Sequence, residues 1–207
     1  MGREGVREAY NTMLRCLRGI LEAARSVCGQ RALVADPNRL DNNLDPNAIY
    51  TAASNYCIRR RAMLLIDPPP EIGDLEDAVE WISGGLTAGG TNAAAYWPRV
   101  RIPDPSNNFK PRAFGPAGVM AGLYSRTDNA RGLWKAPAGT DAKLRGVQEP
   151  LYKLTDAANG VLNPLGLNCI RSFPVYGIVP WGARPPAGPA ATAREGEYVP
   201  VRRPPRP

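Results

Sequence analysis

Apolar residues spaced three and four positions apart predict an amphipathic helix over residues 5–28. Arginines and one glutamate occupy the opposite side, and Gly29 is the residue type favoured just after a helix ends. A basic amphipathic helix can lie on a membrane surface, but packing onto its own protein or a neighbouring subunit is commoner and is the expectation here. The apolar positions are Val6, Tyr10, Met13, Leu14, Leu17, Ile20, Leu21, Ala24, Val27 and Cys28.

Two short, continuously apolar runs, at 32–35 and 62–66, are each followed by an Asp-Pro turn and are typical of buried strands. Between them, Asp45 as N-cap and Pro46 at the first helical position predict a helix over 47–60. A strand, a helix and a strand of these lengths form a βαβ unit. The two strands should therefore be parallel and covered on both faces.

The pattern further along the chain predicts more alternating helices and strands. We expect a helix over 74–83, broken by Gly84-Gly85, and then a core strand that joins 93–97 to Val100 and Ile102 and is made irregular by Pro98. A helix over 113–125 and a short helix over 155–162 should follow. The last expected elements are two strands, at 169–173 and 178–181, on either side of a turn. We therefore predict an α/β fold with a mostly parallel central sheet and helices on both faces, preceded by the N-terminal helix and followed by an irregular tail.

Length and composition restrict the class of protein. The 207 residues suffice for one ordinary domain, and 22 Pro and 21 Gly predict prominent loops. No apolar run is long enough for a membrane span, and the start does not resemble a signal peptide, so we expect the chain to remain in the cytoplasm where it is made. The net charge of +7 permits binding to nucleic acid, but the basic residues are scattered rather than arranged in one stripe.

The sequence lacks the groups that common enzymes need. With no histidine there is no usual base for a serine nucleophile, and no Ser-x-x-Lys replaces it. The glycine-rich segment 84–91 lacks the Gly-Lys-Ser/Thr of a phosphate-binding loop and is interpreted as a surface turn. Glu76, Asp77 and Glu80 are expected on the solvated face of their helix. We predict no catalytic, cofactor or metal site.

Four cysteines lie far apart, without a Cys-x-x-Cys pair and without histidines that could complete a zinc shell. We interpret them as buried free thiols. They are Cys16, Cys28, Cys57 and Cys169.

Three motifs, in matching order and spacing, resemble the contractile phage tail sheath proteins. The first, within 132–139, is similar to the family's W-K-A-P-A-G signature and contains Trp134, Lys135, Pro137 and Gly139. The second, within 159–168, contains Asn159, Gly160, Asn163, Gly166 and Asn168. The third, within 176–184, contains Tyr176, Gly177, Trp181, Gly182 and Arg184.

The resemblance covers residues 31–184, with weaker similarity in 50–69 and 94–119, and continues at 198–203 in what looks like the start of the family's C-terminal domain. It divides the chain into an N-terminal helix (1–30), a sheath domain (31–184) and a linker with the beginning of the C-terminal domain (185–207). The family would continue with an apolar stretch where this chain has PPRP, so we expect the C-terminal inner domain and arm to be missing through truncation.

The resemblance implies a subtilisin-like fold without catalysis, in a structural subunit of a phage or prophage contractile injection system. It implies six-membered rings of identical subunits, stacked helically around a tail tube and joined to a baseplate, with terminal arms that add strands to neighbours. It implies no nucleic-acid, membrane or cofactor binding, and a place in the virion tail after assembly in the bacterial host cytoplasm. The alternatives are a non-catalytic α/β binding module from a mobile element and an enzyme of subtilisin ancestry.

Overall fold

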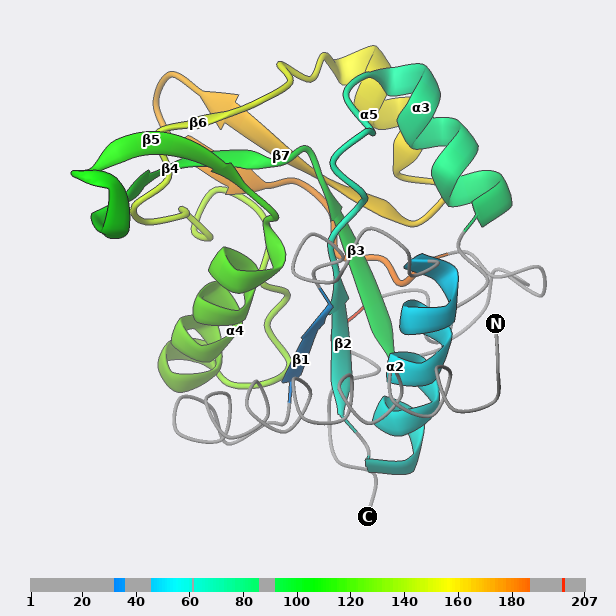
Figure 1. Ribbon diagram of the computed structural model, residues 1–207. Helices are drawn as coiled ribbons and strands as arrows, with labels where there is room; N and C mark the ends of the chain where they lie inside the picture. The colour runs from blue at the N-terminus through cyan, green and yellow to red at the C-terminus, as the bar shows by residue number, and fades with distance from the viewer. Residues whose placement is uncertain (1–31, 36–45, 61, 86–91, 187–198, 200–207) are drawn as a thin grey trace.

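A computed structural model describes residues 32–35, 46–60, 62–85, 92–186 and 199 (Figure 1). Its centre is a five-stranded sheet, in which the first four strands pair in parallel and the last two are antiparallel. The strand order is β1 (Ala32–Ala35), β2 (Met63–Ile66), β3 (Ala93–Trp97), β7 (Leu167–Phe173) and β8 (Gly177–Pro180). This confirms the predicted mixed α/β fold, the parallel βαβ unit and the C-terminal hairpin.

Helices cover both faces of this sheet (Figure 1). The helices α2 (Pro46–Arg60), α3 (Leu75–Glu80) and α5 (Asp156–Leu162) share a hydrophobic cluster with one face, while α4 (Ala117–Arg131) packs on the other. Because successive strand residues point to opposite faces, the continuous apolar run of β2 can supply both clusters. Leu64 and Ile66 belong to the first cluster, and Met63 and Leu65 to the second.

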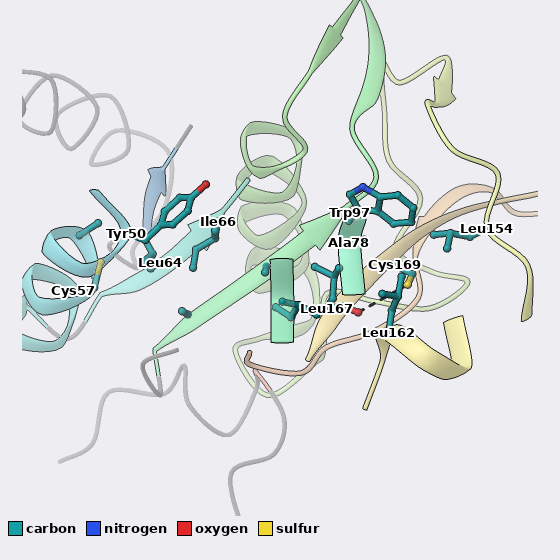
Figure 2. Close-up of a cluster of buried hydrophobic side chains, with 14 of the residues drawn as sticks. Tyr50, Cys57, Leu64, Ile66, Ala78, Trp97, Leu154, Leu162, Leu167 and Cys169 are labelled. Carbon is teal, nitrogen blue, oxygen red and sulfur yellow. Dashed lines mark hydrogen bonds between the residues drawn. The ribbon is translucent and has the colours of Figure 1, made fainter. Parts of the chain in front are cut away.

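The first cluster extends from α2 across the sheet to α5, as the labelled side chains in Figure 2 show. At one end, the buried Tyr50 donates a hydrogen bond from its hydroxyl to the carbonyl oxygen of Asp67, 2.7 Å away. At the other, the buried Trp97 packs its ring 4.9 Å from that of Tyr152. Full burial of one large apolar side chain stabilises the folded state by about 1.5–3 kcal/mol, so this cluster holds the body of the molecule as one unit.

A second, antiparallel sheet was not predicted, and it corrects the expectation of one strand over 93–102. It consists of β4 (Val100–Asp104) between β5 (Lys110–Phe114) and β6 (Glu149–Pro150). After Trp97 the chain leaves the central sheet, and Val100 pairs with Phe114 and Pro150 instead. Val100 is nevertheless fully buried in the second cluster. Its burial was predicted correctly, but burial does not specify which strand a residue pairs with.

Three predicted helices occur with changed bounds. The helix predicted over 113–125 begins later, because residues 110–114 form β5, and continues to Arg131 through a polar stretch. The helix predicted over 74–83 becomes α3 followed by a π-helical turn at Trp81–Gly85, with Asp74 as its N-cap. The helix predicted over 155–162 is α5, and Thr155 caps it by accepting a hydrogen bond from the Ala158 N–H at 3.2 Å.

The N-terminal helix predicted over 5–28, the Asp45 cap and most of the tail predicted after Arg184 lie outside the described residues. Within the tail, Val199 is described: it is buried in the second cluster, and its N–H donates to the Ala183 carbonyl oxygen at 2.8 Å. The three-part division of the chain and the subtilisin-like description of the fold stay predictions.

Candidate assembly surface

The described residues contain no group of three or more His, Cys, Asp or Glu side chains placed to hold a metal ion. Glu76, Asp77 and Glu80 are exposed on α3, as predicted. Most of the glycine-rich segment, residues 86–91, is outside the described part. No described helix combines the length and apolarity needed to cross a bilayer.

Two of the four cysteines are described, and both are buried free thiols, as predicted. Burial raises the pKa of Cys57 from 9.0 to about 12, and it raises the pKa of Cys169 to the same value against the opposing effect of the nearby Arg171 charge. Both thiols are therefore protonated at neutral pH and unreactive as nucleophiles. Cys16 and Cys28 lie outside the described residues.

Asn168 joins the second and third motifs to the centre of the fold. Its side chain is fully buried on β7, and its amide nitrogen donates to the carbonyl oxygens of Ala95 (3.0 Å) and Arg184 (2.8 Å). Its side-chain oxygen accepts from the backbone N–H of Arg184 at 2.7 Å. The chain leaving β8 is thereby tied to β3, two strands away in the central sheet.

The junction that Asn168 forms between β3 and the chain leaving β8 also requires a glycine at position 182. A Cβ atom at this position would lie 2.8 Å from the side-chain oxygen of Asn168 and 3.1 Å from the side-chain nitrogen of Asn163. Contacts below 3.0 Å are essentially never seen for real Cβ atoms, so a side chain here would displace the buried amide. These motif residues have a shared structural role at the end of the sheet.

The end of the first motif and the segment after it cover the outer edge of β8. The N–H of Gly139 donates to the carbonyl oxygen of Pro180 at 2.9 Å, and the N–H of Leu144 donates to that of Ile178 at 2.8 Å. Pro137 is buried beside this segment, and Lys135 forms an ion pair with Asp141 at 3.7 Å. In contrast, Trp134 is 79% exposed.

The two aromatic residues of the third motif meet on the surface of the β7–β8 hairpin through a third aromatic residue, Phe173. The Phe173 ring lies 4.9 Å from that of Trp181 and 6.5 Å from that of Tyr176. The Arg171 guanidinium lies 4.8 Å above Phe173 and pairs with Asp156 at 2.8 Å. We call Phe173, Tyr176 and Trp181 the hairpin aromatic surface; the Arg171 side chain that packs against it is only 10% exposed. Tryptophan and tyrosine are among the residues most enriched in binding hot spots, so this surface has the composition of an interface.

Sequence reasoning identified Tyr176 and Trp181 but missed the roles of Phe173 and Arg171. A signal was present: positions 171 and 173 continue the alternation of Leu167 and Cys169, and therefore share their face of the strand. Two other motif residues lie apart from this surface, on α5. Asn159 has a buried side-chain oxygen with no partner among the described residues, and Gly160 is exposed with open space around it, which leaves its place in the motif unexplained.

Three edge strands have no further partner strand among the described residues: β1 in the central sheet, and β5 and β6 on the two sides of the second sheet. Residues 110–113 of β5 are exposed. An unpaired strand presents a row of backbone N–H and C=O groups that another chain can extend. The described body thus combines an aromatic surface with sheet edges that could accept further strands.

Solved assemblies contain chains similar to this one. A chain of the anti-feeding prophage baseplate, 6-fold symmetrised, is 31% identical over 78% of this chain and 39% of its own length, with a TM-score of 0.59. A chain of the anti-feeding prophage helical sheath in its contracted state is 30% identical over 76% of this chain and 39% of its own, with a TM-score of 0.57. A chain of the PVC sheath complex, an extracellular contractile injection system in its contracted state, is 31% identical over 75% of this chain and 41% of its own length, with a TM-score of 0.61. No protein-family profile and no curated protein sequence matches the chain.

These likenesses first define a class, the structural components of prophage-like contractile injection systems. Within that class, the chain belongs to the contractile tail sheath family, as its three motifs predicted. It spans about two fifths of the length of the chains it matches.

Proposed function

We propose that this chain is a structural subunit of a contractile sheath, which polymerises around an inner tube and shortens to drive that tube through a target cell envelope. The observation that carries the proposal is the likeness, at 30–31% identity over about three quarters of this chain, to chains in two sheath assemblies in their contracted state.

The proposal includes the partners and setting that the motifs predicted. The chain forms six-membered rings with other copies, stacked helically, and contacts the tail tube protein and the baseplate. It binds no nucleic acid, membrane or cofactor and has no catalytic activity. It assembles in the bacterial host cytoplasm and functions in the virion tail, with its central domain in the subtilisin-like arrangement.

The physical features of the described body support an assembly role. Open strand edges such as β1 can accept a strand from a neighbouring copy, which supplies affinity through main-chain hydrogen bonds. Contacts between unlike surfaces of identical subunits generate open helical arrays when the rotation does not close. A body held by two hydrophobic clusters can move as a rigid unit between an extended and a contracted packing.

Co-expression with a tube protein, followed by electron cryo-microscopy and sedimentation, tests the proposal. We expect ordered cylinders with subunits in helical rows around the tube. A chain that stays monomeric with its tube partner present would refute the sheath function and favour the binding-module alternative.

Variants of the hairpin aromatic surface sharpen this test. Tyr176→Ala should abolish or strongly reduce cylinder formation with little effect on the urea unfolding midpoint, because Tyr176 is 48% exposed in the subunit. Ile58→Ala is the matched control, since Ile58 is an equally exposed (50%) apolar residue on α2. Equal assembly by the Tyr176 and Ile58 variants would show that the hairpin aromatic surface is not a subunit contact.

A further inference from the structure

Trp134 packs against the backbone of its own turn and yet is 79% exposed. Its six-membered ring lies on the backbone of Gly132, where a Cβ atom would overlap three ring carbons. Gly132 has φ +89°, and the Lys135 N–H donates to the Gly132 carbonyl oxygen at 3.3 Å, which closes the turn around the indole. The contact with Gly132 restricts the rotamers open to this tryptophan, while most of its ring remains free to meet a partner. Such a side chain is suited to binding, because little further entropy is lost when a partner covers it.

The surroundings of this indole are positively charged. Arg131 and Lys135 flank Trp134 in the sequence and share one carboxylate, that of Asp141, at 3.9 and 3.7 Å. All three charged side chains are between 38% and 65% exposed. Two cations with one anion leave an excess positive charge beside the ring. The partner surface should therefore be acidic.

The same chain carries an acidic surface of this kind. Five exposed carboxylates lie on α3 and the turn before it, and no lysine or arginine occurs from residue 62 to 98. The helix α3 packs in the first hydrophobic cluster and α4, which ends at Arg131, in the second, so the two helices lie on opposite faces of the central sheet (Figure 1). One molecule cannot bring the two surfaces together, but a second copy can. The five carboxylates belong to Glu71, Asp74, Glu76, Asp77 and Glu80.

We propose that Trp134, with Arg131 and Lys135, docks against the acidic face of α3 on a second copy of this chain. The contact is heterologous, joining unlike surfaces, and therefore repeats from copy to copy in an open array. Charge attraction orients the two surfaces, and burial of the indole supplies the anchor. This inference rests on the proposed sheath function and specifies one of the contacts that function requires.

Photo-cross-linking in assembled particles tests the contact directly. Trp134 is replaced by benzoylphenylalanine in the full chain, and cylinders formed with the tube protein are irradiated and digested. We expect a cross-linked dimer whose second peptide contains residues 71–85. Intact cylinders in which cross-links map to other segments, or in which no dimer forms, would overturn the inference and leave the sheath function standing. Wild-type chains that never assemble would refute both.

Charge reversal provides an independent test. Lys135→Glu alone and the Glu76→Lys/Glu80→Lys pair alone should each weaken association by about tenfold or more, and an equimolar mixture of the two variants should recover it. Lys153→Glu, at another exposed lysine, should associate like the wild type. Thermal unfolding of each isolated variant verifies folding. Failure of the mixture to recover, with all variants folded, would contradict the proposed pairing of surfaces.

Discussion

Replacement of Asn168 by alanine is the perturbation that the structure connects most directly to the shared motifs. The substitution removes three hydrogen bonds from a fully buried position, two donated to carbonyl oxygens and one accepted from the Arg184 N–H. At a net value of about 1 kcal/mol for each bond, the free energy of unfolding should fall by about 3 kcal/mol. That is a large share of the roughly 5–15 kcal/mol that stabilises an ordinary domain.

Urea unfolding followed by circular dichroism measures this loss. With a slope of roughly 2 kcal/mol per molar urea, the midpoint should fall by roughly 1.5 M. Asn168→Asp separates hydrogen bonding from volume: it has nearly the same size, but an ionised carboxylate cannot donate to the two carbonyl oxygens, and it should lose at least as much stability at pH 7. Asn129→Ala, at an exposed position on α4, should change stability by less than about 0.5 kcal/mol.

The neighbouring Gly182 makes the test more specific. Gly182→Ala places a methyl group against the Asn168 side chain, so its cost should be smaller when residue 168 is already alanine. A double-mutant cycle should give a coupling energy of about 0.5–3 kcal/mol. A loss below about 1 kcal/mol for Asn168→Ala, or additive effects in the cycle, would refute the view that these motif residues form one buried junction.

Two further predictions concern stability. Gly132→Ala should destabilise the fold by about 1–3 kcal/mol, because the backbone conformation at this position (φ +89°, ψ 168°) is open essentially to glycine alone. Gly122→Ala, in the exposed part of α4, should instead stabilise the fold by about 0.5–1 kcal/mol. Equal urea midpoints for the two variants would contradict this prediction. The raised thiol pKa values predict that the free energy of unfolding depends on pH. A thiol in the unfolded chain loses its proton near pH 9, but Cys57 and Cys169 in the folded protein keep theirs to about pH 12. The stabilisation is therefore complete below pH 9 and is lost as the pH rises toward 12. Unfolding measured from pH 8 to 11 should show a shallower decline in Cys57→Ala than in the wild type, and parallel curves would show that the thiol does not contribute.

The elements that could be predicted from sequence are those whose local pattern and tertiary environment agree. The strands at 32–35 and 63–66 are unbroken apolar runs between turn residues, and the short helix α5 begins at a threonine cap. The second sheet was missed because its strands lack such a pattern. β5 is the exposed sequence KPRAF, and β6 is two residues long. Only pairing with β4 makes these residues strands: β5 follows β4 after a short turn, whereas β6 comes from a segment far along the chain.

The sequence by itself determined the α/β class, the parallel βαβ core, the absence of histidine chemistry and the sheath motifs, because each depends on residue types and spacings within a short stretch. Tertiary structure decided what the motif residues do. It placed Asn168 between two backbone segments, Arg171 and Phe173 beside Tyr176 and Trp181, and Trp134 on the surface instead of in the core. Which side chains are buried together, and which are left facing a neighbour, depends on how distant parts of the chain pack, and a local pattern does not contain that information.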